Sequence, residues 1–147
     1  IIVPKIAELF GKGNLAELKK LIHRSTLLIA ILSLPVVLGI VFFAPFILSF
    51  FDEKAIQGTN ALIIIALGML FNAACGSVDQ ILNMTNNARI FRNISTGCFF
   101  LNVVLNYILI PLYGINGAAA ASLITNVVLN LICIYYIKKK LGFYTFA

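Results

Sequence analysis

Asp79 is the residue whose type and position most suggest chemistry. It lies in a long apolar stretch, 61–84, and is the only charged residue inside any of the long apolar stretches. Burying a charge among apolar groups is costly, so such a carboxylate is a candidate for binding a cation, a proton or a polar solute. Asp79 lies five residues before the end of its stretch. A hydrated vestibule or a structural partner such as Arg89 or Arg92 could therefore satisfy it without any functional role.

Polar and small residues recur every three or four positions in the same stretch. This spacing predicts one polar helical face, made of Gly68, Asn72, Cys75, Gly76, Asp79 and Asn83. Two later stretches repeat the pattern, the first of them with Asn102 and Asn106. Two interpretations stay open, hydrogen bonding between packed helices and a hydrated cavity for a polar solute. Three such faces favour the cavity, with Asn72, Asp79, Asn102 and Asn106 along its wall.

Transmembrane helices are the elements that must position these residues. Of the 147 residues 61% are hydrophobic and 11% are charged, whereas a soluble domain has roughly 45–50% and about 25%. A bilayer core about 30 Å thick is crossed by about 20 helical residues. The stretches 27–51, 61–84, 94–112 and 115–137 are long enough. We therefore predict an all-α integral membrane protein with four transmembrane helices and the end of a fifth at the N-terminus.

The chain divides into three predicted regions. Residues 1–26 hold the end of a preceding helix and a cytoplasmic amphipathic connector, 27–137 form the four-helix transmembrane domain, and 138–147 are a basic cytoplasmic tail. Pro35 and Pro45 each remove a backbone donor from the first span, so kinks or local unwinding are expected there. The chain opens without an initiator Met, and we expect it to be a piece of a longer protein.

The chain has a net charge of +6, and the positions of its basic residues indicate its orientation in the membrane. Five basic residues, Arg24 among them, precede the first span, Arg89 and Arg92 lie in the second link, and three lysines follow the last span. Only Lys54 remains for the opposite side, so the positive-inside rule places both ends in the cytoplasm. This placement argues against a nucleic-acid partner. The three cysteines lie far apart without metal-ligand spacing, and no cofactor, metal site or enzyme active site is indicated.

The segment from Asn102 to Ser122 resembles a recurring segment of polysaccharide-export flippases, in the multidrug/oligosaccharidyl-lipid/polysaccharide exporter superfamily. Residues 4–10 and the basic connector after them are similar to the segment before the ninth helix there. The positions that match the family pattern are Asn102, Asn106, Pro111, Tyr113, Gly114, Gly117 and Ala118. Physical reasoning gives several of these a structural role, because Pro111 and Gly114 end one helix while Gly117 lets the next pack closely.

The resemblance implies that the four spans are helices nine to twelve of a 12 to 14 helix transporter. They would belong to its second six-helix lobe and need the missing N-terminal lobe as a partner. Such a protein moves a lipid-linked oligosaccharide across the bacterial plasma membrane by alternating access, in contact with membrane lipids, and Pro35 would permit the bending. The spans lack Lys and Arg for a pyrophosphate. The missing lobe could supply them, or Arg24, Arg89 and Arg92 at the cytoplasmic mouth.

Other functions stay open. Within the same superfamily they are a drug/cation antiporter, in which the carboxylate binds H⁺ or Na⁺, and a peptidoglycan-precursor flippase. From different classes they are a membrane-embedded enzyme and a structural membrane subunit.

Overall fold

The computed structural model describes residues 2–50 and 53–145. Every regular element in these ranges is a helix, as the all-α prediction requires. The elements are α1 (Ile2–Gly11), α2 (Leu15–Ser49), the short 3₁₀ helix η1 (Glu53–Gly58), α3 (Thr59–Cys75), α4 (Val78–Met84), α5 (Ala88–Tyr113) and α6 (Ile115–Leu141). The predicted end of the first span at 51, the start of the next link at 52 and the last two tail residues lie outside the described residues.

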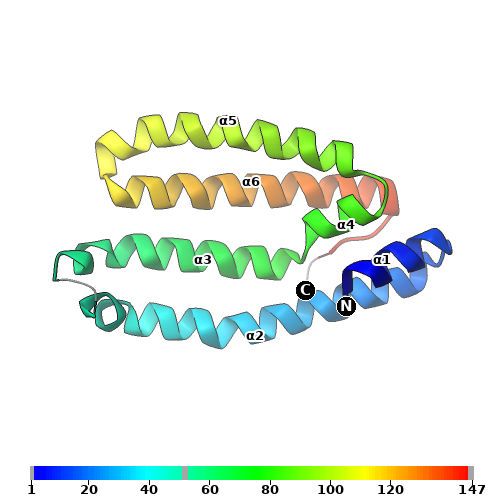
Figure 1. Cartoon of the computed structure of the whole chain (residues 1–147), viewed down its shortest axis with the longest axis horizontal. Helices are drawn as coiled ribbons and strands as arrows, with labels where there is room; N and C mark the ends of the chain where they lie inside the picture. Colours follow the sequence, from blue (N-terminus) through cyan, green and yellow to red (C-terminus); the bar gives the residue numbers. More distant parts are fainter. Residues whose placement is uncertain (1, 51–52, 146–147) are drawn as a thin grey trace.

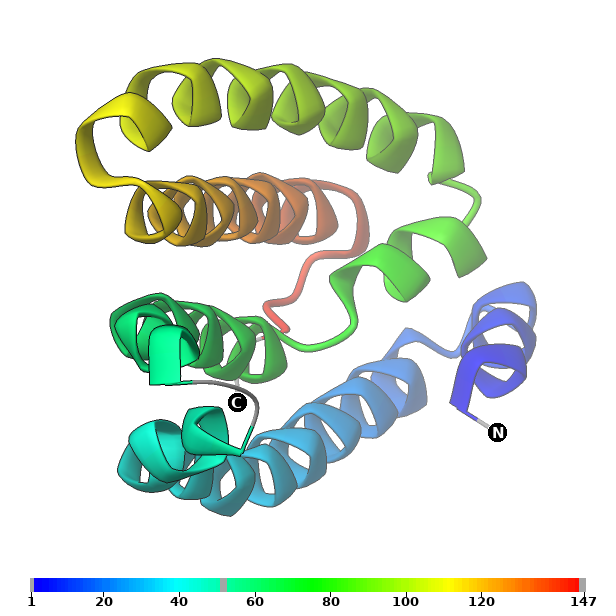
Figure 2. The same cartoon turned by 60° about the vertical axis from the view of Figure 1, so that its left-hand side comes forward.

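The four long helices lie side by side in the order α2, α3, α6, α5 (Figures 1 and 2). This order differs from the order in the sequence, because α6 returns between α3 and α5. The short helices α1 and α4 lie together at one end of the layer, where α4 also contacts α5 and α6. Helices α5 and α6 therefore form a helical hairpin. Helix α6 also packs against α3, so it connects the hairpin to the first two spans.

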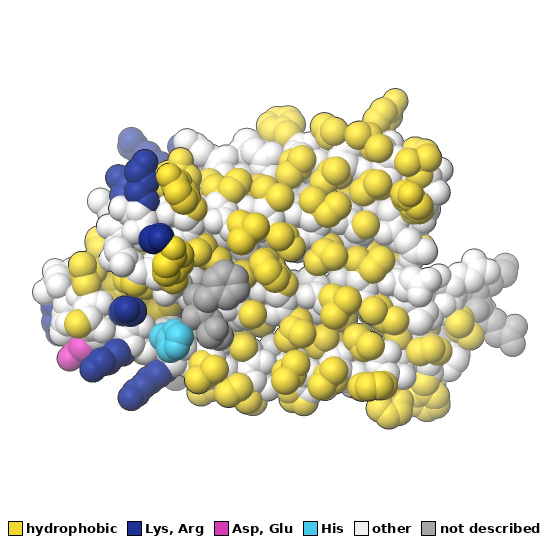
Figure 3. Space-filling view, turned by 180° about the vertical axis from the view of Figure 1, so that it is seen from behind, with side chains coloured by type: hydrophobic (Ala, Val, Ile, Leu, Met, Phe, Trp, Pro, Cys, Tyr) yellow, Lys and Arg dark blue, Asp and Glu magenta, His cyan; other side chains and the backbone are white. Residues whose placement is uncertain are grey.

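Within the described residues, four helices are long and apolar enough to cross a membrane, namely Leu15–Ser49, Ile56–Cys75, Ala88–Tyr113 and Ile115–Leu141. In the most apolar part of each, only 6% to 33% of the residues are buried within the chain. Figure 3 shows hydrophobic side chains spread along the helices and the basic side chains gathered at one end. In water such a surface would be unstable, so lipid or further helices must cover it. The chain is a multi-pass membrane protein.

Helix α2 differs from the prediction in two ways. It begins at Leu15, where the Asn14 side chain accepts a hydrogen bond from the Glu17 amide (3.3 Å), and it runs through the predicted boundary at 26 without interruption. Pro35 and Pro45 both lie inside this continuous α-helix, so the expected local unwinding is wrong. Each proline removes one backbone donor, whereas unwinding in a membrane would leave several backbone groups without partners.

The predicted span 61–84 is also wrong as one helix. It divides into α3 and α4 at Gly76 and Ser77, so its polar residues do not share one helical face. Gly76 has φ +80° and ψ 179°, a conformation that is essentially restricted to glycine. A Cβ atom on Gly76 would also overlap the side-chain oxygen of Thr26, which is buried on α2. The break is therefore set by backbone conformation and by close packing against α2.

The best-packed core lies at the end of the layer that carries α1 and α4. It joins these two helices to the start of α2, the end of α6 and the segment after α6, through buried residues such as Leu18, Leu82, Cys133, Ile137 and Phe143. At the opposite end Gly114 (φ +58°) makes the turn between α5 and α6. Gly117 then lies so close to α5 that a Cβ atom would overlap the Leu109 carbonyl. The contact at Gly117 fixes the start of α6 against α5, and the core fixes its end against α1 and α4.

Candidate functional site

A polar groove lies beside the break between α3 and α4. Its volume is about 310 Å³, and it is lined by polar side chains from Asn72 on α3, Ser77 at the break, and Asp79 and Gln80 on α4. The apolar part of its wall comes from Ile29 on α2 and Met69 on α3. The break creates this site, because α4 turns away from the α3 axis and places an amide, a hydroxyl and a carboxylate around one space.

The carboxylate of Asp79 is available to a ligand. Asp79 lies in the first turn of α4, where the backbone N–H groups of a helix favour negative charge, and the residue is exposed. Among the residues that the structure describes, the ion pairs are those of Glu8 with Lys5 and Lys12. The structural partnership with Arg89 or Arg92 that the sequence left open is therefore not formed.

Asn72 connects the groove to the packed interface between α3 and α6. The fully buried Asn130 donates one hydrogen bond from Nδ2 to Asn72 Oδ1 (3.0 Å) and one to the backbone oxygen of Asn126 (2.9 Å). The Asn72 oxygen accepts the first of these bonds, and its amide N–H groups form no hydrogen bond among the described residues, so Asn72 can act as a donor in the groove that it lines. Asp79 contributes only acceptors when ionised, so the groove offers both kinds of hydrogen-bonding group.

Asn102 and Asn106 occupy a different place. Asn106 Nδ2 donates to Asn102 Oδ1 (2.8 Å), and Asn102 Nδ2 donates to Thr125 Oγ1 on α6 (3.2 Å). Thr125 in turn donates to the Ala121 carbonyl (2.8 Å). This row ties α5 to α6, and its residues do not line the groove. The structure thus brings Asn72 and Asp79 together and separates them from Asn102 and Asn106.

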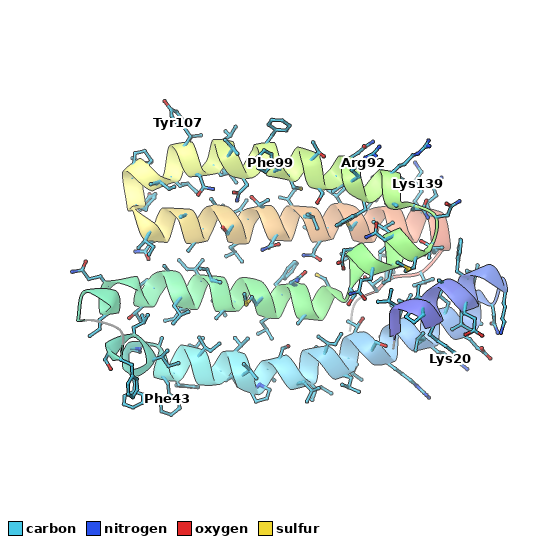
Figure 4. All side chains as sticks on the ribbon, in the orientation of Figure 1. Lys20, Phe43, Arg92, Phe99, Tyr107 and Lys139 are labelled. Carbon is cyan, nitrogen blue, oxygen red and sulfur yellow. The ribbon has the colours of Figure 1, made fainter. Side chains whose placement is uncertain are left out.

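The three predicted arginines are exposed near the same end of the layer. Arg24 is on α2, while Arg89 and Arg92 are in the first turns of α5. Arg89 also lines an open cavity of about 560 Å³ with Asn86 and Asn87. Figure 4 shows Arg92 at the end of α5 that carries α4, with Lys139 of α6 nearby. None of the three arginines lines the groove, and together they are called the basic rim below.

The remaining predicted residues have structural roles in helices or in the turn between α5 and α6. Pro35 lies mid-helix in α2, Pro111 lies inside α5 two residues before its end, and Gly114 and Gly117 form the tight turn and contact between α5 and α6. The sequence reasoning missed Ser77 and Gln80. A signal was present, because Gly76 is followed by Ser77 and, three residues later, by Gln80, a pattern typical of the start of a helix.

Comparison with known proteins places the chain among membrane proteins. A family model described as MatE matches residues 3–108. The uncharacterized membrane protein MJ1375 of Methanocaldococcus jannaschii is 29% identical over 140 residues, which cover 95% of this chain and 33% of that protein. The chain therefore spans about a third of the length of this curated relative. No solved structure matches the chain significantly.

Proposed function

Because the chain belongs to the MatE family, whose members are membrane transporters, we propose that the whole protein exports a lipid-linked oligosaccharide by alternating access. The described helices would form part of its second lobe, and the remaining helices would close the solute pathway opposite them. The observation that carries the proposal is the polar groove at the break between α3 and α4. In this groove the side chains of Ser77, Asp79 and Gln80 form no hydrogen bond among the described residues, while Asn72 is bonded to α6 through its oxygen alone.

The groove suits sugar hydroxyl groups, which donate and accept hydrogen bonds. Asn72 offers donors, Asp79 offers acceptors, and Ser77 and Gln80 offer both. Its described lining has no aromatic side chain, whereas sites for organic cations typically surround the cation with aromatic rings. The basic rim of Arg24, Arg89 and Arg92 would attract the pyrophosphate of the carrier lipid, on the side that the positive-inside rule assigns to the cytoplasm. The bacterial plasma membrane is the compartment we propose.

The break between α3 and α4 also supports alternating access at this groove. In many transporters the solute binds where a membrane helix is interrupted, because the interruption frees backbone and side-chain groups that a continuous helix would use. Here α4 packs against α1 as well as α5 and α6. Rocking of one lobe against the other would therefore open or close the groove without breaking the buried contact between α3 and α6. Bending at Pro35 of α2 would accompany that motion.

One observation favours a second candidate, a drug/cation antiporter of the same superfamily. Asp79 carries the groove's only acidic side chain and has no described basic partner, so it could bind H⁺ or Na⁺. A peptidoglycan-precursor flippase would use the same groups as the first candidate, because its solute is also a lipid-linked glycan.

The test uses the full-length protein in vesicles loaded with a polyprenyl-diphosphate oligosaccharide. Transfer is followed by the access of an impermeant glycosidase to the glycan. We expect transfer by the wild type and a roughly tenfold slower rate in Asp79→Asn and Asn72→Ala, because each loses a hydrogen bond to the solute. Asn126→Ala, which removes an exposed amide of α6 outside the groove, is the matched control and should leave the rate unchanged.

The two candidates give different results. Cation-driven drug efflux that is lost in Asp79→Asn, together with no oligosaccharide transfer, would replace the flippase proposal with the antiporter. Equal rates in the groove variants and the control would remove the groove from the mechanism.

A further inference from the structure

A second groove lies at the basic end of α6, away from the polar groove. Its volume is about 510 Å³, and it is lined by Leu131, Ile134, Tyr135, Lys138, Lys139 and Tyr144. Leu131, Tyr135 and Lys138 recur at helical spacing, so they form a stripe on one face of α6. Seven residues of helix span roughly 10 Å, so the stripe passes from the apolar span at Leu131 to the charged boundary at Lys138.

The segment after α6 builds the second wall of this groove. Gly142 adopts a left-handed conformation (φ +79°) and ends the helix. Phe143 then lies in the core with 6% of its surface exposed, and Thr145 is fully buried. These two anchors hold Tyr144 between them beside α6. The groove therefore has two walls, one from α6 and one from the segment after it, and differs from a row of lysines on an exposed helix.

The lysines of the groove have no carboxylate partner among the described residues. Lys138 donates a hydrogen bond to the Tyr144 hydroxyl, and its ammonium lies 4.3 Å from the centre of the Tyr144 ring. In the part of the chain that the structure describes, neither Lys138 nor Lys139 forms an ion pair with a carboxylate. Lys138 is thus held in place by an aromatic ring, and no carboxylate of the described residues compensates its charge.

We propose that this groove binds one anionic glycerophospholipid of the surrounding bilayer. The phosphate would lie between Lys138 and Lys139 with the Tyr144 hydroxyl beside it, and an acyl chain would run along Tyr135 and Leu131 into the membrane. The combination points to this occupant, because an apolar stripe at membrane depth continues into a positive charge at the interface that no described carboxylate pairs with. A zwitterionic lipid would place a positive choline group against the same lysines. This site is independent of the solute that the protein exports.

The experiment uses the full-length protein, purified in detergent, stripped of lipid and titrated by native mass spectrometry. Phosphatidylglycerol and phosphatidylcholine with identical chains are compared. Lys138→Gln/Lys139→Gln should weaken phosphatidylglycerol binding about 30-fold, or about fivefold for each lysine, and should leave phosphatidylcholine binding unchanged. Tyr144→Ala, which removes the second wall without altering charge, should also weaken phosphatidylglycerol binding.

The matched control is Lys19→Gln/Lys20→Gln, which removes two exposed lysines from the start of α2 at the same end of the layer (Figure 4). An equal loss in this control would show that the attraction is diffuse and would overturn the proposal. Displacement of the lipid by soluble glycerol phosphate at equal concentration would do the same, since the acyl chain would then contribute nothing. A wild-type protein that retains no phosphatidylglycerol, with the groove crosslinking to another segment of the full-length protein, would identify a different occupant and would also overturn it.

Discussion

Replacing Gly76 with alanine should both destabilise the protein and disturb the polar groove. The new Cβ destabilises the folded state in two ways, through backbone strain and through overpacking. At φ +80° and ψ 179° a residue with a side chain is strained by about 1–3 kcal/mol. The Cβ also overlaps the Thr26 side-chain oxygen and lies 3.2 Å from its methyl carbon, and overpacking of this kind typically costs about 1–3 kcal/mol. The free energy of unfolding should therefore fall by about 2–6 kcal/mol.

A second substitution separates these two costs. Gly76→Ala/Thr26→Ala removes the two Thr26 atoms closest to the new Cβ, so it should recover most of the overpacking cost but none of the backbone strain. Gly76→Ala/Thr26→Val keeps an atom in place of the hydroxyl and should recover little. The measurement is unfolding of the full-length protein in mixed micelles by added sodium dodecyl sulfate, with oligosaccharide transfer measured in parallel.

The matched control for Gly76→Ala is Gly97→Ala, at an exposed helical glycine of α5 where a Cβ meets nothing within 4 Å. It should raise the free energy of unfolding by up to about 1 kcal/mol, because alanine loses less entropy than glycine in a helix. A Gly76→Ala protein as stable as the wild type would refute the reasoning about the break. So would equal recovery by the alanine and valine partners.

Three further predictions follow from contacts of the described residues. Asn130→Ala should lower the free energy of unfolding by about 0.6–1.7 kcal/mol per lost interhelical bond and should slow transfer, both measured as above, because Asn72 loses its anchor. Gly117→Ala should weaken the α5–α6 hairpin, because the Cβ meets a backbone carbonyl, and crosslinking between cysteines placed on the two helices should fall. The hydrogen bond that Lys12 donates to Glu8 (2.6 Å) holds the pKa of that carboxyl below its ordinary value, and carbon NMR should show the pKa rising in Lys12→Gln. Since this pKa is lowered, the stabilisation of α1 by the pair is present above the ordinary carboxyl pKa and is lost as the pH falls through the lowered one.

The sequence predicted the fold class because length and apolar composition alone determine whether a helix can cross a bilayer. It did not predict the division of 61–84. Hydrophobicity and spacing describe side chains, whereas the break at Gly76 depends on a positive φ and on contact with Thr26, a residue 50 positions earlier. At Pro35 the sequence predicted unwinding where the helix is continuous. The lost backbone donor is visible in the sequence, whereas the cost of unwinding a helix in lipid is not.

The hydrogen-bond partners of the polar residues could not be predicted from the sequence either. Spacing placed Asn72, Asp79, Asn102 and Asn106 on polar faces, but their partners depend on α6 returning between α3 and α5. That position lets α6 bind one neighbour through Asn130 and the other through Thr125. Interhelical hydrogen bonding therefore holds for Asn102 and Asn130, whereas a cavity for a polar solute stays a prediction. Amides between neighbouring helices are used for packing, whereas those beside the α3–α4 break remain available.

Asn72 belongs to both groups, and this makes it the residue that can separate structure from function. Its oxygen accepts the hydrogen bond from Asn130 at the interface, while its N–H groups have no described partner and the residue lines the groove. Asn72→Asp keeps an oxygen that accepts from Asn130 Nδ2 but removes the donors, so it should retain most of the stability and lose transfer. Asn130→Ala keeps the Asn72 donors but removes their anchor, so it should lower both stability and transfer. A stable Asn72→Asp protein with normal transfer would show that the groove does not need these donors, and the solute would have to be recognised elsewhere.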